Sequence, residues 1–167
     1  MATTNQIFIP RSVAADNVDS LVKTGVAASV DLRNGDIVVL GAKTNGVYAL
    51  TPYATGATNI GIVYNADVEN IEGYRVGGSD PRKIVFPAGT PVNVFIPQAW
   101  DEVAYTVIAG TAAGATYLVP TNGAMDLTYS DDAPTTGDGF VIKITGTGFV
   151  SVGGERVATV EGKVEFA

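Results

Sequence analysis

Residues 28–41 read Ala28-Ser-Val-Asp-Leu32, then Arg33-Asn-Gly35, then Asp36-Ile-Val-Val-Leu-Gly41. The two flanking runs have the length and the β-branched content of strands. The Asn34-Gly35 pair between them tolerates the positive φ angles of a two-residue hairpin turn. This stretch therefore predicts a β-hairpin and sets the pattern for the chain that follows.

Short apolar runs separated by Gly, Pro and Asn turn signals continue to the end of the chain. No long amphipathic helical pattern competes with them, so we expect an all-β fold, either a compact β-barrel or a β-sandwich. The further strands are expected at 47–50, 59–64, 83–86, 92–96, 103–108, 116–119, 126–129, 139–145 and, as a final pair, between 156 and 166.

The first 25 residues differ from this pattern. Ile7-Phe8-Ile9-Pro10-Arg11 predicts a short extended arm, because proline lacks an amide donor and favours extended backbone before it. Asp16–Gly25 predicts one short helix with Asp16 as its N-cap and Gly25 as its stop. We therefore divide the chain into an N-terminal arm with a short helix, residues 1–25, and a β domain, residues 26–167.

A faint internal repeat bears on the organisation of the β domain. Residues 45–52 (NGVYALTP) and 114–120 (GATYLVP) both place Tyr, two apolar residues and a Pro after a turn that contains Gly. Two related β-subdomains that meet near residues 98–101 would account for it. Chance accounts for it equally well in a chain with 20 Gly.

The composition excludes several classes of function. The chain of 167 residues contains no Cys and no His, which excludes disulfides, thiol catalysis and an imidazole base. A net charge of −7 with only 10 Lys plus Arg argues against binding to nucleic acid or to an anionic membrane. No basic signal-peptide start and no run of about 18 apolar residues is present, so we expect synthesis in a cytoplasm.

Acidic side chains and one tryptophan are the candidates for chemistry. Asp131, Asp132 and Asp138 supply carboxylates of the kind that bind Ca²⁺, but their spacing is not that of an EF-hand loop. A solvated loop is the better interpretation, so we expect no metal and no cofactor. Trp100, the sole Trp, fits a core or interface anchor better than a sugar-stacking residue.

The hairpin sequence of residues 32–41, LRNGDIVVLG, resembles a phrase found in small head proteins of tailed bacteriophages. The order that follows it, a strand at 47–50, a Thr/Ala/Gly loop at 51–58 and a strand at 60–64, is similar to their layout. The resemblance is to the capsid decoration (cement) proteins. It implies a non-enzymatic virion protein, made in the host cytoplasm, that binds the major capsid protein on the capsid exterior and stabilises the coat lattice.

Within this hypothesis, the residues expected to bind the capsid are Ile7, Phe8, Ile9 and Arg11 of the arm. The opposing interpretation is that the arm packs on its own β domain. The sequence does not decide between these two interpretations, and it does not give the oligomeric state. An alternative function is a phage tail, baseplate or fibre domain that binds a host glycan or protein. An enzyme with only acidic residues, such as a glycosidase, needs two carboxylates across a cleft and is the least favoured class.

Overall fold

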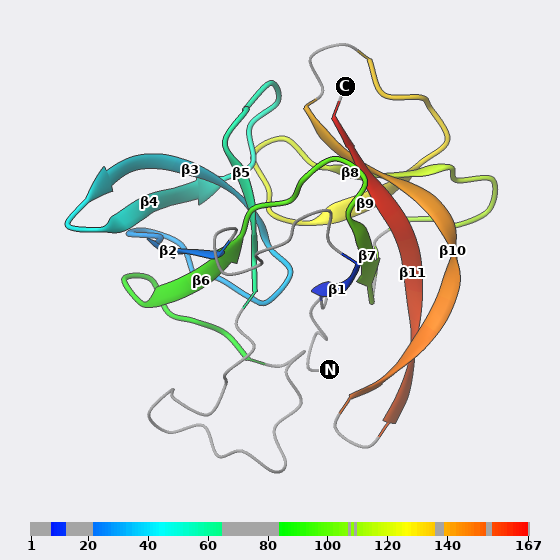
Figure 1. Ribbon diagram of the computed structural model, residues 1–167, viewed down its shortest axis with the longest axis horizontal. Helices are drawn as coiled ribbons and strands as arrows, with labels where there is room; N and C mark the ends of the chain where they lie inside the picture. The colour runs from blue at the N-terminus through cyan, green and yellow to red at the C-terminus, as the bar shows by residue number, and fades with distance from the viewer. Residues whose placement is uncertain are drawn as a thin grey trace.

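The computed structural model describes residues 8–12, 22–64, 84–106, 108, 110–135, 139–152 and 155–166, and its regular structure is entirely β (Figure 1). The expected all-β class is confirmed. The described residues form two sheets, a small closed barrel and an open sheet of six strands. In chain order, the strands are β1 (Phe8–Ser12), β2 (Val22–Val26), β3 (Ile37–Thr44), β4 (Val47–Pro52), β5 (Ile60–Val63), β6 (Pro91–Phe95), β7 (Glu102–Tyr105), β8 (Tyr117–Pro120), β9 (Leu127–Ser130), β10 (Phe140–Val152) and β11 (Glu155–Phe166).

The barrel closes in the order β2-β4-β3-β5-β6, with β6 pairing back to β2. Its hairpin of β3 and β4 turns at Asn45-Gly46, where the φ angles are 51° and 86°. Two successive positive φ angles define a type I′ turn, whose twist suits paired strands. Among the barrel pairings only β2 with β4 is parallel.

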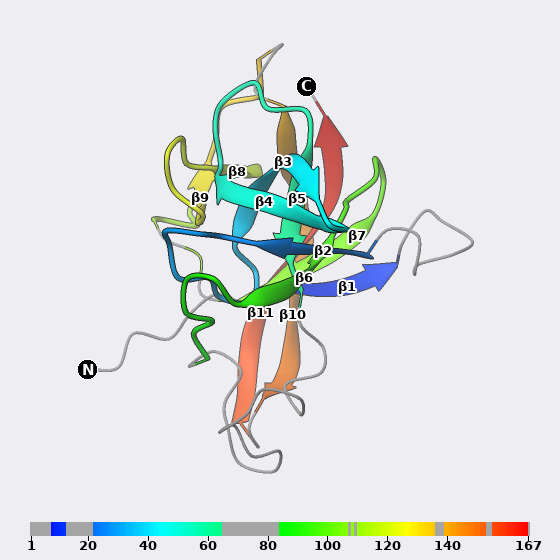
Figure 2. The same cartoon turned by 90° about the vertical axis from the view of Figure 1, so that its left-hand side faces the viewer.

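The open sheet has the order β1-β7-β11-β10-β8-β9, so β1 and β9 are its edges. The two longest strands, β10 and β11, form an antiparallel hairpin at its centre. One end of this hairpin extends beyond the other strands, as both views show (Figures 1 and 2). A register shift between Ile144 and Gly146 marks where β10 leaves the sheet, and such bulges bend a strand and increase its twist.

The barrel and the open sheet share one hydrophobic core. Its buried members come from both sheets: Phe8, Ile37, Tyr53, Ile60, Ile62, Phe95, Val103, Tyr105, Leu118, Leu127, Phe140, Ile142 and Val164. A second cluster, which includes Leu40, Leu50 and Val94, fills the barrel interior. The sheets therefore pack as two layers of one unit.

The predicted hairpin at 28–41 is only half correct. Asn34-Gly35 does form a turn and β3 follows it, but residues 28–32 are not a strand of that hairpin. Leu32 instead makes an isolated β-bridge to Phe86, which lies in the strand predicted at 83–86. Lys83 of that predicted strand lies outside the described residues. The strands that pair with β3 are β4 and β5. The two-residue hairpin turn that the Asn-Gly pattern predicts occurs at the second Asn-Gly pair.

The predicted helix at 16–25 is wrong where the structure describes it. Residues 16–21 lie outside the described part, and residues 22–25 belong to strand β2. Val22 and Thr24 are β-branched and pair with β6, so tertiary pairing outweighs the local helix signals. The described part of the chain contains no helix.

The proposed division of the chain also differs from the arrangement of the sheets. Residues 8–12 and 22–25, which the sequence analysis places in the arm, belong to strands of the open sheet and of the barrel. The change from barrel to open sheet falls between Phe95 and Glu102, around the suggested division at 98–101. The final region, predicted as a pair of strands, is the single strand β11.

Candidate functional site

A tight turn at Arg33–Asp36 leads into the barrel strand β3 and contacts the open sheet through Tyr105. The Asp36 N–H donates to the Arg33 carbonyl at 3.2 Å, and the Arg33 N–H donates to Oδ2 of Asp36 at 2.7 Å. Gly35 has a φ of 93°, which glycine adopts without a steric penalty. Strand β5 anchors the turn, because the Gly35 N–H donates to the Val63 carbonyl at 2.8 Å.

The same turn recurs at Gln98–Asp101. The Asp101 N–H donates to the Gln98 carbonyl at 3.2 Å, and the Gln98 N–H donates to Oδ2 of Asp101 at 2.8 Å. The position of Gly35 is taken by Trp100, which has a φ of 76° and an exposed fraction of 69%. The Trp100 N–H donates to the Val164 carbonyl of β11 at 2.9 Å. A bulky residue in this conformation is a true backbone outlier.

Asp36 is buried at the seam between the barrel and the open sheet, with an exposed fraction of 5%. Burial raises the pKa of its carboxyl to about 7, and the negative charge of Asp126 adds to the rise. The hydrogen bond from the Arg33 N–H and the charge of Arg33 oppose it. From the open sheet, the buried hydroxyl of Tyr105 donates to the Gly35 carbonyl at 3.4 Å. Burial, and then the charge of Asp36, raise the pKa of Tyr105.

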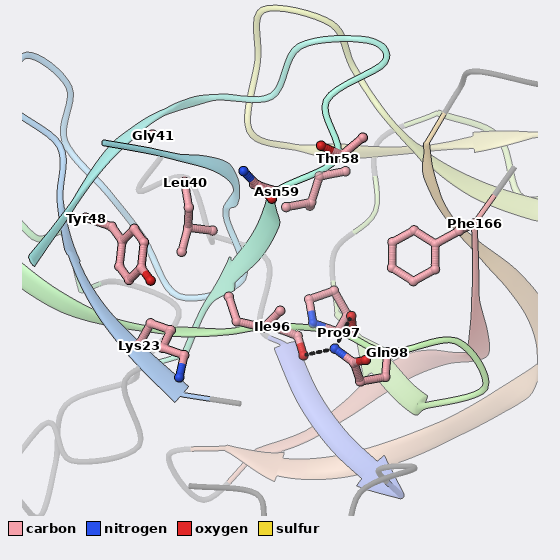
Figure 3. A pocket seen from close by; sticks show the side chains of 11 residues that line it. Lys23, Leu40, Gly41, Tyr48, Thr58, Asn59, Ile96, Pro97, Gln98 and Phe166 are labelled. Carbon is pink, nitrogen blue, oxygen red and sulfur yellow. Dashed lines mark hydrogen bonds between the residues drawn. The ribbon is translucent and has the colours of Figure 1, made fainter. Parts of the chain in front are cut away.

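A groove of about 420 Å³ lies between the barrel and the end of β11 (Figure 3). That volume lies within the range of ligand sites in proteins. In the close-up, Tyr48 and Lys23 lie on one side and Phe166 on the other, with Ile96, Pro97 and Gln98 between them. The barrel therefore supplies one wall and the last strand the other.

The lining of the groove combines apolar walls with polar groups and one cation. The apolar lining comes from Leu40, Tyr48, Ile60, Ile96, Pro97 and Phe166, and the polar lining from Lys23, Thr58, Asn59 and Gln98. The side-chain amide of Gln98 donates to the Pro97 carbonyl at 3.2 Å, which fixes its orientation. The lining includes no acidic residue. Such a groove can bind a ligand, but it contains no pair of carboxylates for acid–base chemistry.

The structure places Phe8, one of the four residues expected to bind a capsid, in the shared core with an exposed fraction of 1%. Its ring packs against Tyr64, Phe95 and Tyr105 at centroid distances of 5.7, 5.4 and 5.5 Å. Phe8 is therefore not available to a partner in this structure.

The other three residues of that set are placed only in part. Ile7 lies outside the described residues, and the backbone of Ile9 and Arg11 forms part of strand β1 beside β7. Residues 8–12 therefore pack on the β domain of their own chain, which is the second of the two interpretations of the arm.

The weak calcium candidates do not form a described site. Asp131 and Asp132 are exposed after β9, and the Asp132 N–H donates to the Ser130 hydroxyl at 3.2 Å. Asp138 lies outside the described residues. Within the described ranges, no group of three acidic side chains is placed to hold a metal ion. The same ranges contain no helix that is long and apolar enough to span a membrane.

Comparisons with protein-family models, with curated proteins and with solved structures found no match to this chain. The groove and the buried Asp36 were not identified as a site from the sequence. The sequence offers one signal for the two matching turns: in both Arg33–Asp36 and Gln98–Asp101, the fourth residue is Asp.

Proposed function

We propose that this protein is a non-enzymatic virion structural protein that binds the outer surface of a phage capsid and stabilises the coat lattice. Its partner would be the major capsid protein. The observation that carries the proposal is the free end of the β10–β11 hairpin, which extends beyond the body of the molecule (Figure 2).

The free end of the hairpin begins at the pair of Gly148 with Thr159 and continues to the pair of Val152 with Glu155. β8 pairs with β10 only at residues 142–143, and β7 pairs with β11 only at residues 160–163. No third strand of the described part therefore flanks the free end, and isolated two-stranded hairpins are only marginally stable in water. Contact with a partner would supply the missing packing.

The side chains of the free end suit a protein contact. Phe149 has an exposed fraction of 55%, and the guanidinium of Arg156 lies 3.9 Å from the centre of its ring. Aromatic residues and Arg are enriched in interfaces, and this stacking orients both groups in advance. Five residues of extended chain in each strand give this free end a length of about 17 Å.

The proposed mechanism is thermodynamic. A protein that binds only the assembled shell stabilises that state by mass action. Repetition of the contact over a symmetric lattice adds avidity when one molecule touches two coat subunits.

Quantitative mass spectrometry on density-purified particles from the source culture tests the proposal. We expect the protein to co-purify with a major coat protein, either near the copy number of that protein or at about one copy per six. The first ratio indicates binding at three-fold-type positions and the second indicates binding at the centres of hexamers. Absence from the particles would refute the proposal.

One observation favours the alternative function, a tail, baseplate or fibre domain that binds a host glycan. Trp100 is the most exposed of the large apolar side chains that the structure describes, and its backbone is strained. Exposed Trp rings can stack on sugar rings. A glycan-array signal that is lost in Trp100→Ala, together with very few copies per particle, would favour this alternative.

A further inference from the structure

We infer that the groove between the barrel and the end of β11 binds a peptide segment of a partner protein in which a carboxylate stands next to an apolar side chain. This inference goes beyond the proposed capsid role and does not require it. The partner is defined only by this chemistry.

Charge is the first reason for an acidic ligand. The chain has 17 Asp plus Glu against 10 Lys plus Arg, yet the groove is lined by Lys23 and by no acidic residue. Lys23 is half-buried in β2, and no carboxylate of the described residues lies within ion-pair distance of it. Lys43 is not part of the lining, but it brings a second positive charge close to it, because its ammonium lies 5.2 Å from the centre of the ring of Tyr48, a lining residue. An acidic group in the groove would complement both charges.

The apolar walls are the reason for an adjacent apolar side chain. Leu40 and Ile96 face the hollow from the barrel, and Phe166, with an exposed fraction of 47%, faces it from β11 (Figure 3). A side chain inserted between these walls would remove apolar surface from water on both sides.

The amides explain why a peptide fits better than a sugar. Asn59 carries a carbonyl acceptor and an NH₂ donor, which match the N–H and C=O groups of a peptide backbone. The NH₂ of Gln98 already donates to the Pro97 and Ile96 carbonyls, so Gln98 offers its side-chain carbonyl to a peptide N–H. Of the two aromatic rings in the lining, Tyr48 and Phe166, that of Tyr48 has the Lys43 ammonium over it, which leaves less aromatic surface on which a sugar could stack. The walls are otherwise mostly aliphatic.

Nuclear magnetic resonance titration of the full chain with defined peptides tests the inference. The probes are three acetylated and amidated heptapeptides of Gly and Ser with central Phe-Glu, Phe-Gln or Ser-Glu. We expect the Phe-Glu peptide to shift the signals of Tyr48 and Phe166 with a Kd of about 1 mM. The Phe-Gln and Ser-Glu peptides should each bind at least about 5-fold more weakly.

Two variants provide the matched comparison. Lys23→Gln should bind the Phe-Glu and Phe-Gln peptides equally, because the cation that distinguishes them is gone. Lys163→Gln removes a lysine outside the groove, one whose ammonium lies 3.4 Å from a Glu102 carboxylate oxygen, and should keep the preference. Both folds are checked by their unperturbed core signals.

Three outcomes would overturn the inference. The first is that none of the peptides shifts the signals of the groove residues. The second is that Lys23→Gln still prefers the Phe-Glu peptide. The third is that glucuronate shifts the groove signals saturably whereas the peptides do not. None of them bears on whether the protein is present on phage particles, which tests the proposed function separately.

Discussion

Asp36 and Asp101 occupy the same position in two matching turns, and each accepts a hydrogen bond through Oδ2 from the backbone N–H three residues before it, at 2.7 and 2.8 Å. The residue before each Asp has a positive φ, and it is glycine in the first turn and Trp100 in the second. Both turns lead directly into a strand, β3 or β7. The two turns therefore provide matched controls for each other.

The first prediction concerns the pH dependence of stability. Because the pKa of Asp36 is raised from 3.8 to about 7, the folded protein retains a proton that the unfolded chain releases. The free energy of unfolding should therefore fall as the pH rises from about 4 to about 7, by on the order of 4 kcal/mol, and stay lower above that range. Asp36→Asn keeps an oxygen acceptor for the Arg33 N–H and should remove this loss.

Urea denaturation at pH 5 and pH 8 measures this effect. Asp36→Asn should be more stable than the wild type at pH 8 and close to it at pH 5. Asp101→Asn makes the same chemical change in the matching turn and shows how much of the effect belongs to the turn itself. Equal pH dependence in the wild type and Asp36→Asn would contradict the prediction.

The second prediction concerns backbone strain at Trp100, where φ is 76°. Trp100→Ala keeps the strain because alanine has a Cβ, whereas Trp100→Gly relieves it. Trp100→Gly should therefore be more stable than Trp100→Ala by about 1 kcal/mol in chemical denaturation. In the matching turn, Gly35→Ala should lose about 1 kcal/mol or more. If Trp100→Ala is instead more stable than Trp100→Gly, the backbone at residue 100 is not strained.

The third prediction concerns β1. Phe8 is buried against three aromatic rings, so Phe8→Ala should cost about 3–5 kcal/mol of unfolding free energy. Phe149→Ala removes a ring of the same size that has an exposed fraction of 55%, and it should cost less than about 1 kcal/mol. Thermal denaturation of the two variants distinguishes them. A small effect at Phe8 would mean that β1 does not pack on the body in solution.

The fourth prediction concerns packing inside the barrel. A Cβ at Gly61 would overlap the Val94 side chain and lie 2.8 Å from a methyl of Leu40, so Gly61→Ala should cost about 1–3 kcal/mol. At Gly41, also in the barrel, the nearest atom to a new Cβ is the Ala49 carbonyl oxygen at 3.4 Å. Gly41→Ala should therefore change stability by less than about 1 kcal/mol in the same urea titration. Equal effects would show that the barrel can expand around Gly61.

Much of the fold could be predicted from the sequence because strand signals are local. The strands at 47–50, 59–64, 92–96 and 116–119 follow from apolar runs between turn residues, and each coincides with a described strand within a few residues. Partner choice is not local, which is why Leu32 pairs with Phe86 rather than across the nearby Asn-Gly turn. The same reason makes Val22 part of a strand despite helix signals beside it.

The candidate site could not be predicted because its parts come together only in the folded chain. Lys23 and Phe166 line one groove although they stand near opposite ends of the sequence. Asp36 looks like an ordinary turn residue in the sequence, and its raised pKa depends on burial beneath a separate sheet. The nearby Pro10 makes the sequence around Phe8 look like an extended arm. The aromatic rings that bury Phe8, such as that of Tyr105, belong to residues far along the chain.

The shared core also constrains how the protein folds during translation. Phe8 packs on Tyr105, and the core is complete only when Val164 joins it. The open sheet therefore cannot close until nearly all of these 167 residues have left the ribosome, although the barrel strands β2–β6 emerge much earlier. Such long-range pairings slow folding and leave strand edges open in the meantime. Before β11 emerges, β7 and β10 each lack the strand that lies between them in the folded sheet.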